Sequence, residues 1–236
     1  MTETLTEIVL LPGLDGTGML FERLQQQLPA DAVCVTVVAY PADPSMTYRD
    51  YAALVTAIVG SRRVVLLGES FSGPVAVMVA AAMPDQVRGL MLSATFLQSP
   101  WPGWLVRLAS RFNPIAAPNS LRDIVLMGRR RDAELSSQIS AIVAGMPAGI
   151  RASRMIEVSR IDVRAEFSRL TCPILALHDA ADWIVPKRQL EVAIRNKRDA
   201  RVVIIYGAHM VLQTQPRLAA QHILKFVRTL NRPDVQ

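Results

Sequence analysis

The pattern of hydrophobic and polar positions divides the chain into short apolar runs that alternate with segments of helical periodicity. Six runs rich in β-branched residues and leucine predict strands that are buried on both faces. They lie at residues 8–13, 33–40, 64–68, 87–95, 173–179 and 201–207. Strands that are apolar throughout and alternate with helices predict a parallel sheet covered on both sides.

The segments between these strands place their apolar residues at the spacing of one helix face. Residues 71–83 are apolar on all sides, which predicts a buried helix directly after the third strand. The other predicted helices have apolar faces formed by Phe21, Leu24 and Leu28, by Tyr51, Leu54, Val55 and Ile58, by Leu190, Ala193 and Ile194, and by Ala219, Ile223, Phe226, Val227 and Leu230.

The alternation breaks after residue 95, where frequent prolines separate short helical pieces such as residues 132–143. A chain of 236 residues that is 51% hydrophobic is long enough for one sizeable core. We therefore expect one α/β domain, with a mostly parallel sheet of about six strands flanked by helices. Residues 1–95 and 169–236 would form the two parts of its core, and residues 96–168 a helical cap inserted over the sheet edge.

Composition narrows the class of protein. The N-terminal stretch lacks the basic start of a signal peptide, and the longest uncharged run is interrupted by prolines and glycine, which argues against a membrane span. Two cysteines without metal-like spacing favour the cytoplasm. The net charge is +6, and residues 96–170 hold 11 arginines against 6 acidic residues, yet no basic run carries the interleaved aromatic residues of a nucleic-acid platform. We expect a cytoplasmic protein that binds no nucleic acid.

Four candidate functional residues follow the predicted strands. Leu14 follows the first strand, Ser70 the third, Asp182 the fifth and His209 the last. In a parallel sheet, the loops beyond the carboxyl ends of the strands converge at one edge. We therefore expect the fold to bring these four residues together.

The junction after the third strand, GESFSG at residues 68–73, is the sharpest of these signals. A nucleophile on a strand-to-helix turn needs a strained backbone and small residues two positions away on either side. Gly68 meets this need, whereas Ser72 stands where glycine is usual and Gly73 follows one position later. Ser70 is thus expected to be a nucleophile, and the alternative is a serine that caps the helix.

From about residue 7 to residue 230, the chain resembles the serine hydrolases of the α/β-hydrolase fold. Ser70 matches the nucleophile of this family, and the segments ADWIVP and YGAHMVLQTQP match those that carry its acid and its base, in the family's order. These matches select Asp182 and His209. The segment LPGLDGTG resembles the oxyanion loop, with Pro12 where many members have histidine.

The resemblance implies a triad in which His209 takes the proton of Ser70 and Asp182 orients the imidazole ring. The backbone N–H groups of Leu14 and Phe71 would form the oxyanion hole. A serine nucleophile, rather than a carboxylate, argues against the dehalogenases and epoxide hydrolases of this fold. We expect hydrolysis of a carboxylic ester or thioester, without a cofactor or a metal.

Other ionisable residues are alternatives for these roles. Asp179 is a second possible acid. His178 is expected to line or support the pocket, and His222 to be a solvated or half-buried surface residue of the last helix. Glu69 adjoins the nucleophile, but strand alternation points its side chain away from the pocket. Asp15 is expected to form a turn with its own backbone.

Two other functions remain open. The segments LPGLDGTG and GESFSG are also similar to the acyltransferase-like branch of the fold that makes fatty esters of phytol, and the sequence does not distinguish water from an alcohol as acceptor. Some proteins of this fold have lost catalysis and bind ligands only, although a complete set of triad and oxyanion residues argues against that interpretation here.

The substrate is expected to bind under the cap. Residues 156–186 resemble the same stretch in carboxylesterases that demethylate pimeloyl-carrier-protein esters and hold the acidic carrier with cap arginines. This resemblance implies a small ester substrate and an acidic acyl-carrier protein as partner, the alternative being an ordinary solvated basic face. The candidate docking residues are Arg129, Arg130, Arg131, Arg151 and Arg154. Residues that either line an acyl pocket or pack between cap helices are Trp101, Trp104, Met127, Met146 and Met155.

Overall fold

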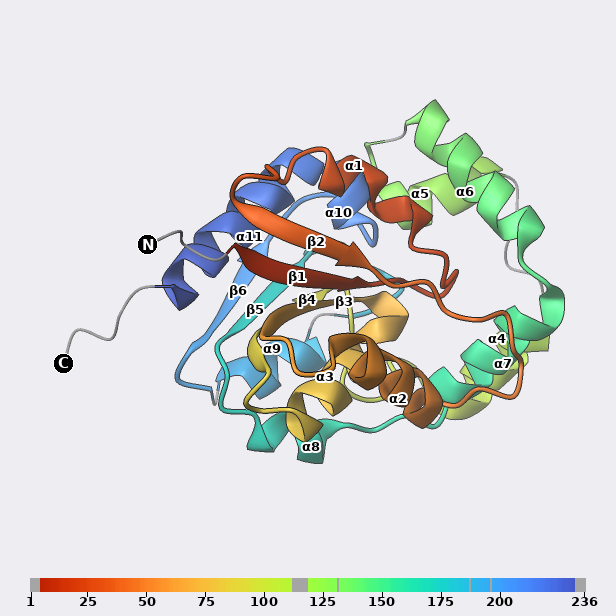
Figure 1. Cartoon of the computed structure of the whole chain (residues 1–236). Coiled ribbons are helices and arrows are strands. Elements are labelled where there is room, and N and C mark those ends of the chain that lie inside the picture. The colour runs from red at the N-terminus through yellow and green to blue at the C-terminus, as the bar shows by residue number, and fades with distance from the viewer. Residues whose placement is uncertain (1–4, 112–118, 131, 187, 196, 232–236) are drawn as a thin grey trace.

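The centre of the molecule is a six-stranded sheet (Figure 1). The structure is a computed structural model and describes residues 5–111, 119–130, 132–186, 188–195 and 197–231. The strands are β1 (Thr6–Leu11), β2 (Val33–Val37), β3 (Val64–Glu69), β4 (Val87–Ser93), β5 (Ile174–His178) and β6 (Ala200–Ile204). They lie in the order β2-β1-β3-β4-β5-β6, and all neighbouring pairs are parallel. The predicted sheet is confirmed.

Helices cover both faces of the sheet, as the strand pattern predicts. One face packs against α2 (Tyr48–Val59), α3 (Gly73–Ala82), α8 (Arg164–Arg169) and α9 (Arg188–Arg195), and the other against α1 (Glu22–Gln25), α10 (Val211–Thr214) and α11 (Pro216–Leu230). Alternate residues of β1 serve the two faces: Val9 and Leu11 join the first core, and Ile8 and Leu10 join the second. None of the helices described is long and apolar enough to cross a membrane.

The segment after β1 departs from the predicted helix. Phe21, Leu24 and Leu28 are all buried, but they are carried by the 3-10 turn η1 (Met19–Phe21), the short helix α1 and a following turn. The N–H of Leu28 already bonds the carbonyl three residues back rather than four. Pro29 comes next, and the residue before a proline disfavours the helical conformation, which explains the early end.

The connection between β4 and β5 forms the cap beyond the carboxyl ends of the strands (Figure 1). It contains α4 (Gly103–Arg111), α5 (Asn119–Met127), α6 (Ala133–Gly145) and α7 (Ala148–Val158). At its base two extended segments pair, with the N–H of Val163 donating to Leu97 at 2.7 Å and that of Ser99 to Ile161 at 3.1 Å. The last part of the predicted cap range belongs to α8, which packs Phe167 into the core against α3.

Candidate active site

Ser70 stands at the turn where β3 ends and helical structure begins. Its φ of 49° lies in the left-handed region, a conformation that costs an L-residue about 1 kcal/mol or more. The 3-10 turn η2 (Ser70–Ser72) leads directly into α3, and Thr95 donates a hydrogen bond from Oγ1 to the carbonyl of Ser70. The turn leaves the side chain of Ser70 partly exposed while its neighbours are buried. This geometry is the strand-to-helix turn that the sequence predicts.

Ser72 gives a physical reason for the departure of GESFSG from the usual motif. Its side chain is fully buried, and its hydroxyl donates to the carbonyl of Pro12 in the loop after β1. Tyr40 Oη lies 2.7 Å from Ser72 Oγ and donates to it, because the proton of Ser72 is already committed. On this side of Ser70, glycine is needed at position 73, because a Cβ on Gly73 would overlap the side chain of Thr95. Ser72 therefore ties the turn at the nucleophile to the predicted oxyanion loop.

The structure brings Ser70, His209 and Asp182 together at the carboxyl edge of the sheet. His209 Nε2 lies 2.9 Å from Ser70 Oγ, and His209 Nδ1 lies 2.9 Å from Asp182 Oδ2. An ionised carboxylate only accepts, so Nδ1 donates to it and Nε2 of the neutral ring accepts from the serine hydroxyl. Asp182 Oδ1 accepts from the N–H groups of Ile184 and Val185 at 2.9 and 3.0 Å, which fixes the carboxylate.

The surroundings of His209 favour its charged form. Burial alone lowers the pKa of an imidazole, but the charge and hydrogen bond of Asp182, together with the charge of Glu69, raise the pKa of His209 above its ordinary value of 6.5. Burial raises the pKa of Asp182, but the charge and hydrogen bond of His209 outweigh it, so the net pKa lies below the ordinary value. Both shifts favour the imidazolium–carboxylate pair that forms when His209 accepts a proton.

Asp179, the alternative acid, holds backbone on both sides of the site. Its Oδ2 accepts from the N–H groups of Gly207 and Ala208, the latter at 2.9 Å, and its Oδ1 accepts from the N–H of Ala181. These bonds join the loop after β5 to the loop that carries His209. Ala208 has a φ of 53°, so the backbone just before His209 is held in a strained conformation.

Other ionisable residues lie around the site. Glu69 is buried and accepts from Gln213 Nε2 at 2.8 Å, and burial raises its pKa to about 7. Burial also lowers the pKa of His178, which favours a neutral ring at the end of β5. His222 is half-buried on α11, as predicted. Within the ranges that the structure describes, no cluster of histidine, cysteine and acidic residues is arranged to hold a metal ion.

The loop after β1 passes beside the nucleophile. A hydrogen bond of 3.1 Å from the N–H of Gly16 to the carbonyl of Gly13 closes its turn. The carboxylate of Asp15 accepts from the N–H two residues later at 2.8 Å, which is the predicted turn-forming role. A Cβ placed on Gly13 would lie 3.9 Å from Ser70 Cβ. The backbone of the loop, which includes Leu14, therefore runs directly along the site.

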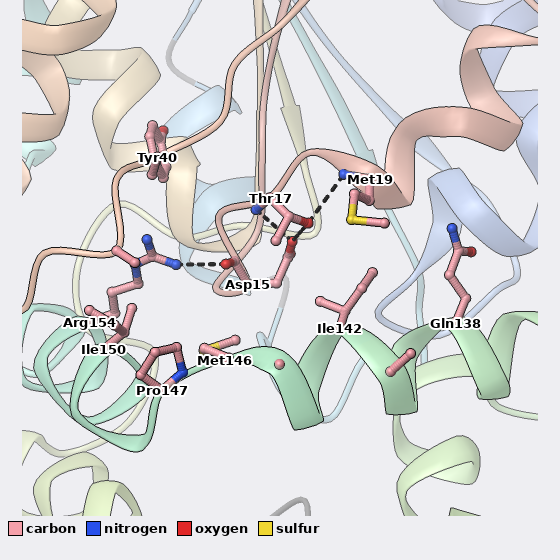
Figure 2. A pocket seen from close by; sticks show the side chains of 13 residues that line it. Asp15, Thr17, Met19, Tyr40, Gln138, Ile142, Met146, Pro147, Ile150 and Arg154 are labelled. Atoms are coloured by element: carbon pink, nitrogen blue, oxygen red, sulfur yellow. Dashed lines mark hydrogen bonds between the residues drawn. The ribbon is translucent and has the colours of Figure 1, made fainter.

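A pocket of about 380 Å³ separates this loop from the cap (Figure 2). Asp15 and Thr17 line it from the loop, and α6, α7 and the turn between them line it mainly with apolar side chains, including Ile142, Met146 and Ile150. Met146 is thus the predicted acyl-pocket residue that faces this space. The pocket adjoins the loop rather than containing Ser70 itself.

The other four candidates for an acyl pocket lie elsewhere. Met127 is buried in a small cap cluster that includes Met210, and Met155 packs against the core. Trp101 and Trp104 are 46% and 66% exposed. Trp101 Nε1 also donates to the carbonyl of Ile184, two residues after Asp182, at 2.9 Å. Met127 and Met155 therefore have packing roles instead of lining the acyl pocket, and the two tryptophans face solvent.

The candidate docking arginines differ in exposure. Arg129 and Arg130 are exposed directly after α5, and Arg131 lies outside the described residues. Arg151 is buried on α7. Of the four that the structure describes, Arg129 and Arg130 lie where a partner could reach them.

Arg154 is 1% exposed, so the prediction that it meets a carrier at the surface is wrong. Its guanidinium is enclosed by main-chain carbonyls and by tyrosine rings. A signal of this burial was present in the sequence, because Ile150, Arg154 and Val158 recur every four residues, the spacing of one helix face. All three are buried on α7.

Comparison with known proteins identifies the family of this chain. The model of the alpha/beta hydrolase family matches residues 8–222, and the chain belongs to this family. Two similar proteins are pimeloyl-[acyl-carrier protein] methyl ester esterases. The one from Aeromonas salmonicida is 25% identical over 243 aligned positions, covering 94% of this chain and 95% of the relative. The one from Proteus mirabilis is 23% identical over 202 residues, covering 80% and 77%.

Solved structures share the fold. The enol-lactonase from Burkholderia xenovorans LB400 matches with a TM-score of 0.83 at 16% identity, over 95% of this chain and 92% of that chain. Together with the family match, this confirms the predicted resemblance to esterase-like α/β hydrolases.

Proposed function

We propose that the protein is a serine esterase that cleaves a carboxylic ester through an acyl-enzyme on Ser70. The two hydrogen bonds of 2.9 Å that join Ser70, His209 and Asp182 are the observation that supports this most strongly. Ser70 Oγ forms a bond to the ester carbonyl carbon while its proton passes to His209 Nε2. The bond to the alcohol then breaks, and His209 returns the proton to the leaving oxygen. Water repeats the sequence on the acyl-enzyme and releases the acid.

The backbone N–H groups of Leu14 and Phe71 stabilise the negative charge that develops on the carbonyl oxygen in this proposal. Phe71 directly follows the nucleophile and lies within η2, two residues before α3 begins, where N–H groups and the helix dipole favour an anion. Leu14 follows Gly13, which lies beside Ser70. The loss of one such donor costs on the order of 10²-fold in rate.

The pocket beside the loop suits one aliphatic arm of the ester. Its cap side is formed by Ile142, Met146, Pro147 and Ile150, and burial of each methylene there contributes about 0.8 kcal/mol. The name of the similar esterases specifies a pimeloyl-[acyl-carrier protein] methyl ester. We place the acyl chain of such an ester in this pocket.

The exposed basic end of α5 suits an acidic carrier protein. Arg129 and Arg130 present two cations there, and Arg131 follows in sequence. Guanidinium groups bind phosphate and carboxylate groups in a bidentate manner. Arg151 is not part of this docking proposal, because it is buried.

Hydrolysis of p-nitrophenyl esters of increasing chain length tests the proposed reaction. We expect the wild type to release nitrophenolate, and Ser70→Ala and His209→Ala to lose this activity while remaining folded, as shown by a cooperative thermal unfolding transition. Ser61→Ala, which removes an exposed hydroxyl, is the matched control and keeps full activity. Full turnover by folded Ser70→Ala would overturn the proposal.

A further inference from the structure

Arg154 is a buried cation that reaches from the cap to the loop after β1 (Figure 2). Its Nη1 donates to the carbonyls of Leu14 and Asp15 at 2.9 and 2.8 Å. Its Nη2 donates to the carbonyl of Pro41 at 3.2 Å, and its Nε donates to Tyr51 Oη at 3.1 Å. One side chain on α7 thus holds two consecutive carbonyls of the predicted oxyanion loop.

The charge of Arg154 is compensated by dipoles and aromatic rings. Its guanidinium carbon lies 5.9 Å from the ring centre of Tyr40 and 5.7 Å from that of Tyr51. No ion pair joins it to a carboxylate in the part of the chain that the structure describes. Burying an unpaired cation is costly, and an apolar side chain would fill the space at no such cost. The hydrogen bonds to the loop therefore point to a positioning role.

Every carbonyl from residue 12 to residue 16 accepts a hydrogen bond. Pro12 accepts from Ser72, Gly13 from Gly16 at 3.1 Å, Leu14 and Asp15 from Arg154, and Gly16 from Tyr40 at 2.7 Å. Of these donors, Arg154 belongs to the cap and the others to the core. The Leu14 N–H belongs to the same planar peptide as the Gly13 carbonyl. Because the Gly13 carbonyl and the carbonyls before and after it, those of Pro12 and Leu14, are all held by hydrogen bonds, the direction of the Leu14 N–H is fixed.

The packing at Gly16 agrees with this arrangement. Gly16 has a φ of 73°, and a Cβ there would overlap the guanidinium of Arg154. The helix that carries Arg154 is also anchored one turn later, where the carboxylate of Glu157 accepts from the N–H of Tyr48 at 3.0 Å. Helix α7 is therefore held to the core at two points, one of them the predicted oxyanion loop.

We propose that Arg154 is a positioning residue that holds the Leu14 N–H toward the reacting carbonyl oxygen and so couples the cap to the oxyanion hole. This inference rests on the proposed esterase function. It predicts that loosening α7 from the loop weakens stabilisation of the transition state more than it weakens binding of the substrate.

Arg154→Met tests the role because it removes the donors and keeps an unbranched stem. We express kcat per active site, and count the active sites as the serines that a saturating fluorophosphonate labels. Unfolded molecules are not counted in this way, so partial unfolding leaves the value unaffected. We expect kcat on a p-nitrophenyl ester to fall about 10- to 100-fold with a smaller change in KM. The affinity of a trifluoromethyl ketone, which adds to the serine and places an oxyanion in the hole, should fall in parallel. Arg107→Met, an exposed arginine on α4, is the matched control and should leave both values unchanged.

Chemical rescue of Arg154→Ala distinguishes positioning from a general effect on the fold. The truncation opens space next to the pocket of about 380 Å³ that Arg154 lines, so small cations have a route to the vacated position. Millimolar methylguanidinium should restore part of kcat, whereas methylammonium, which has the charge without the planar donors, should restore less.

The outcomes separate this inference from the proposed function. If the wild type cleaves esters and Arg154→Met has the wild-type kcat and inhibitor affinity per labelled serine, the positioning role is wrong and the esterase proposal stands. Equal rescue by both cations, or none, also contradicts the role. If the wild type neither cleaves esters nor labels at Ser70, the esterase proposal fails and this inference fails with it.

Discussion

Replacing Glu69 by Gln should remove a large part of the dependence of folding stability on pH. Glu69 is buried beside the nucleophile and accepts from Gln213 at 2.8 Å, and the amide oxygen of a glutamine can accept the same bond. In the folded protein burial raises the pKa of Glu69 from 4.5 to about 7. Between these values the folded state holds a proton that the unfolded state releases, so stability falls as the pH rises.

The size of the effect follows from the two pKa values. A difference of about 2.5 pH units, at about 1.36 kcal/mol for each unit, gives about 3 kcal/mol that is present below pH 4.5 and lost by about pH 8. Glutamine has no proton to lose. The variant should therefore match the wild type near pH 4.5 and exceed its free energy of unfolding by about 3 kcal/mol near pH 8.

Urea unfolding followed by tryptophan fluorescence at several pH values measures this difference. His209 titrates in both proteins, and the charge of Glu69 is the smallest of the causes that raise the pKa of His209, so most of the His209 contribution cancels when the variant is compared with the wild type. Glu22→Gln, the same change at an exposed position of α1, is the control and should follow the wild type at every pH. If wild type and Glu69→Gln lose stability in parallel as the pH rises, Glu69 is not held protonated by burial and the reasoning is refuted.

The remaining predictions concern catalysis and docking. Asp182→Asn should lower kcat on the order of 10⁴-fold. In the wild type, kcat/KM should fall at acid pH with an apparent pKa above 6.5, because His209 must be neutral to accept a proton. An apparent pKa below 6.5 would contradict the pairing of His209 with Asp182. Ser72→Ala should lower kcat about 10-fold without altering KM, because the Pro12 carbonyl loses its donor; a change confined to KM would argue against a role in the oxyanion loop. Charge reversal at Arg129 and Arg130 should raise KM for an acyl-carrier methyl ester in a salt-dependent way and leave a p-nitrophenyl ester unaffected, whereas equal effects on both substrates would exclude carrier docking.

The sheet was predictable because its strands are short, continuous apolar runs separated by helices, a pattern typical of parallel sheets. The turn at Ser70 was predictable because a strained strand-to-helix junction needs small residues, and the sequence has them in order. The order of strands then determines that the loops carrying Asp182 and His209 end at the same edge as Ser70.

The contacts of the cap were harder to predict. Arg154 bonds carbonyls 139 and 140 residues away, and main-chain carbonyls leave no mark in a pattern of side chains. Its charge suggests a surface residue, although its spacing with Ile150 and Val158 indicates a buried face. The exposure of Trp101 and Trp104 likewise depends on how α4 and the segment before it pack, which the local sequence does not determine.

Intact-mass analysis after incubation with a fluorophosphonate shows whether Ser70 is an activated nucleophile, since only an activated serine reacts readily. We expect one adduct on the wild type, located at Ser70 by peptide mapping, and no adduct on Ser70→Ala or His209→Ala. An adduct that persists in folded Ser70→Ala, or a folded wild type that stays unlabelled, would contradict the proposed acyl-enzyme mechanism.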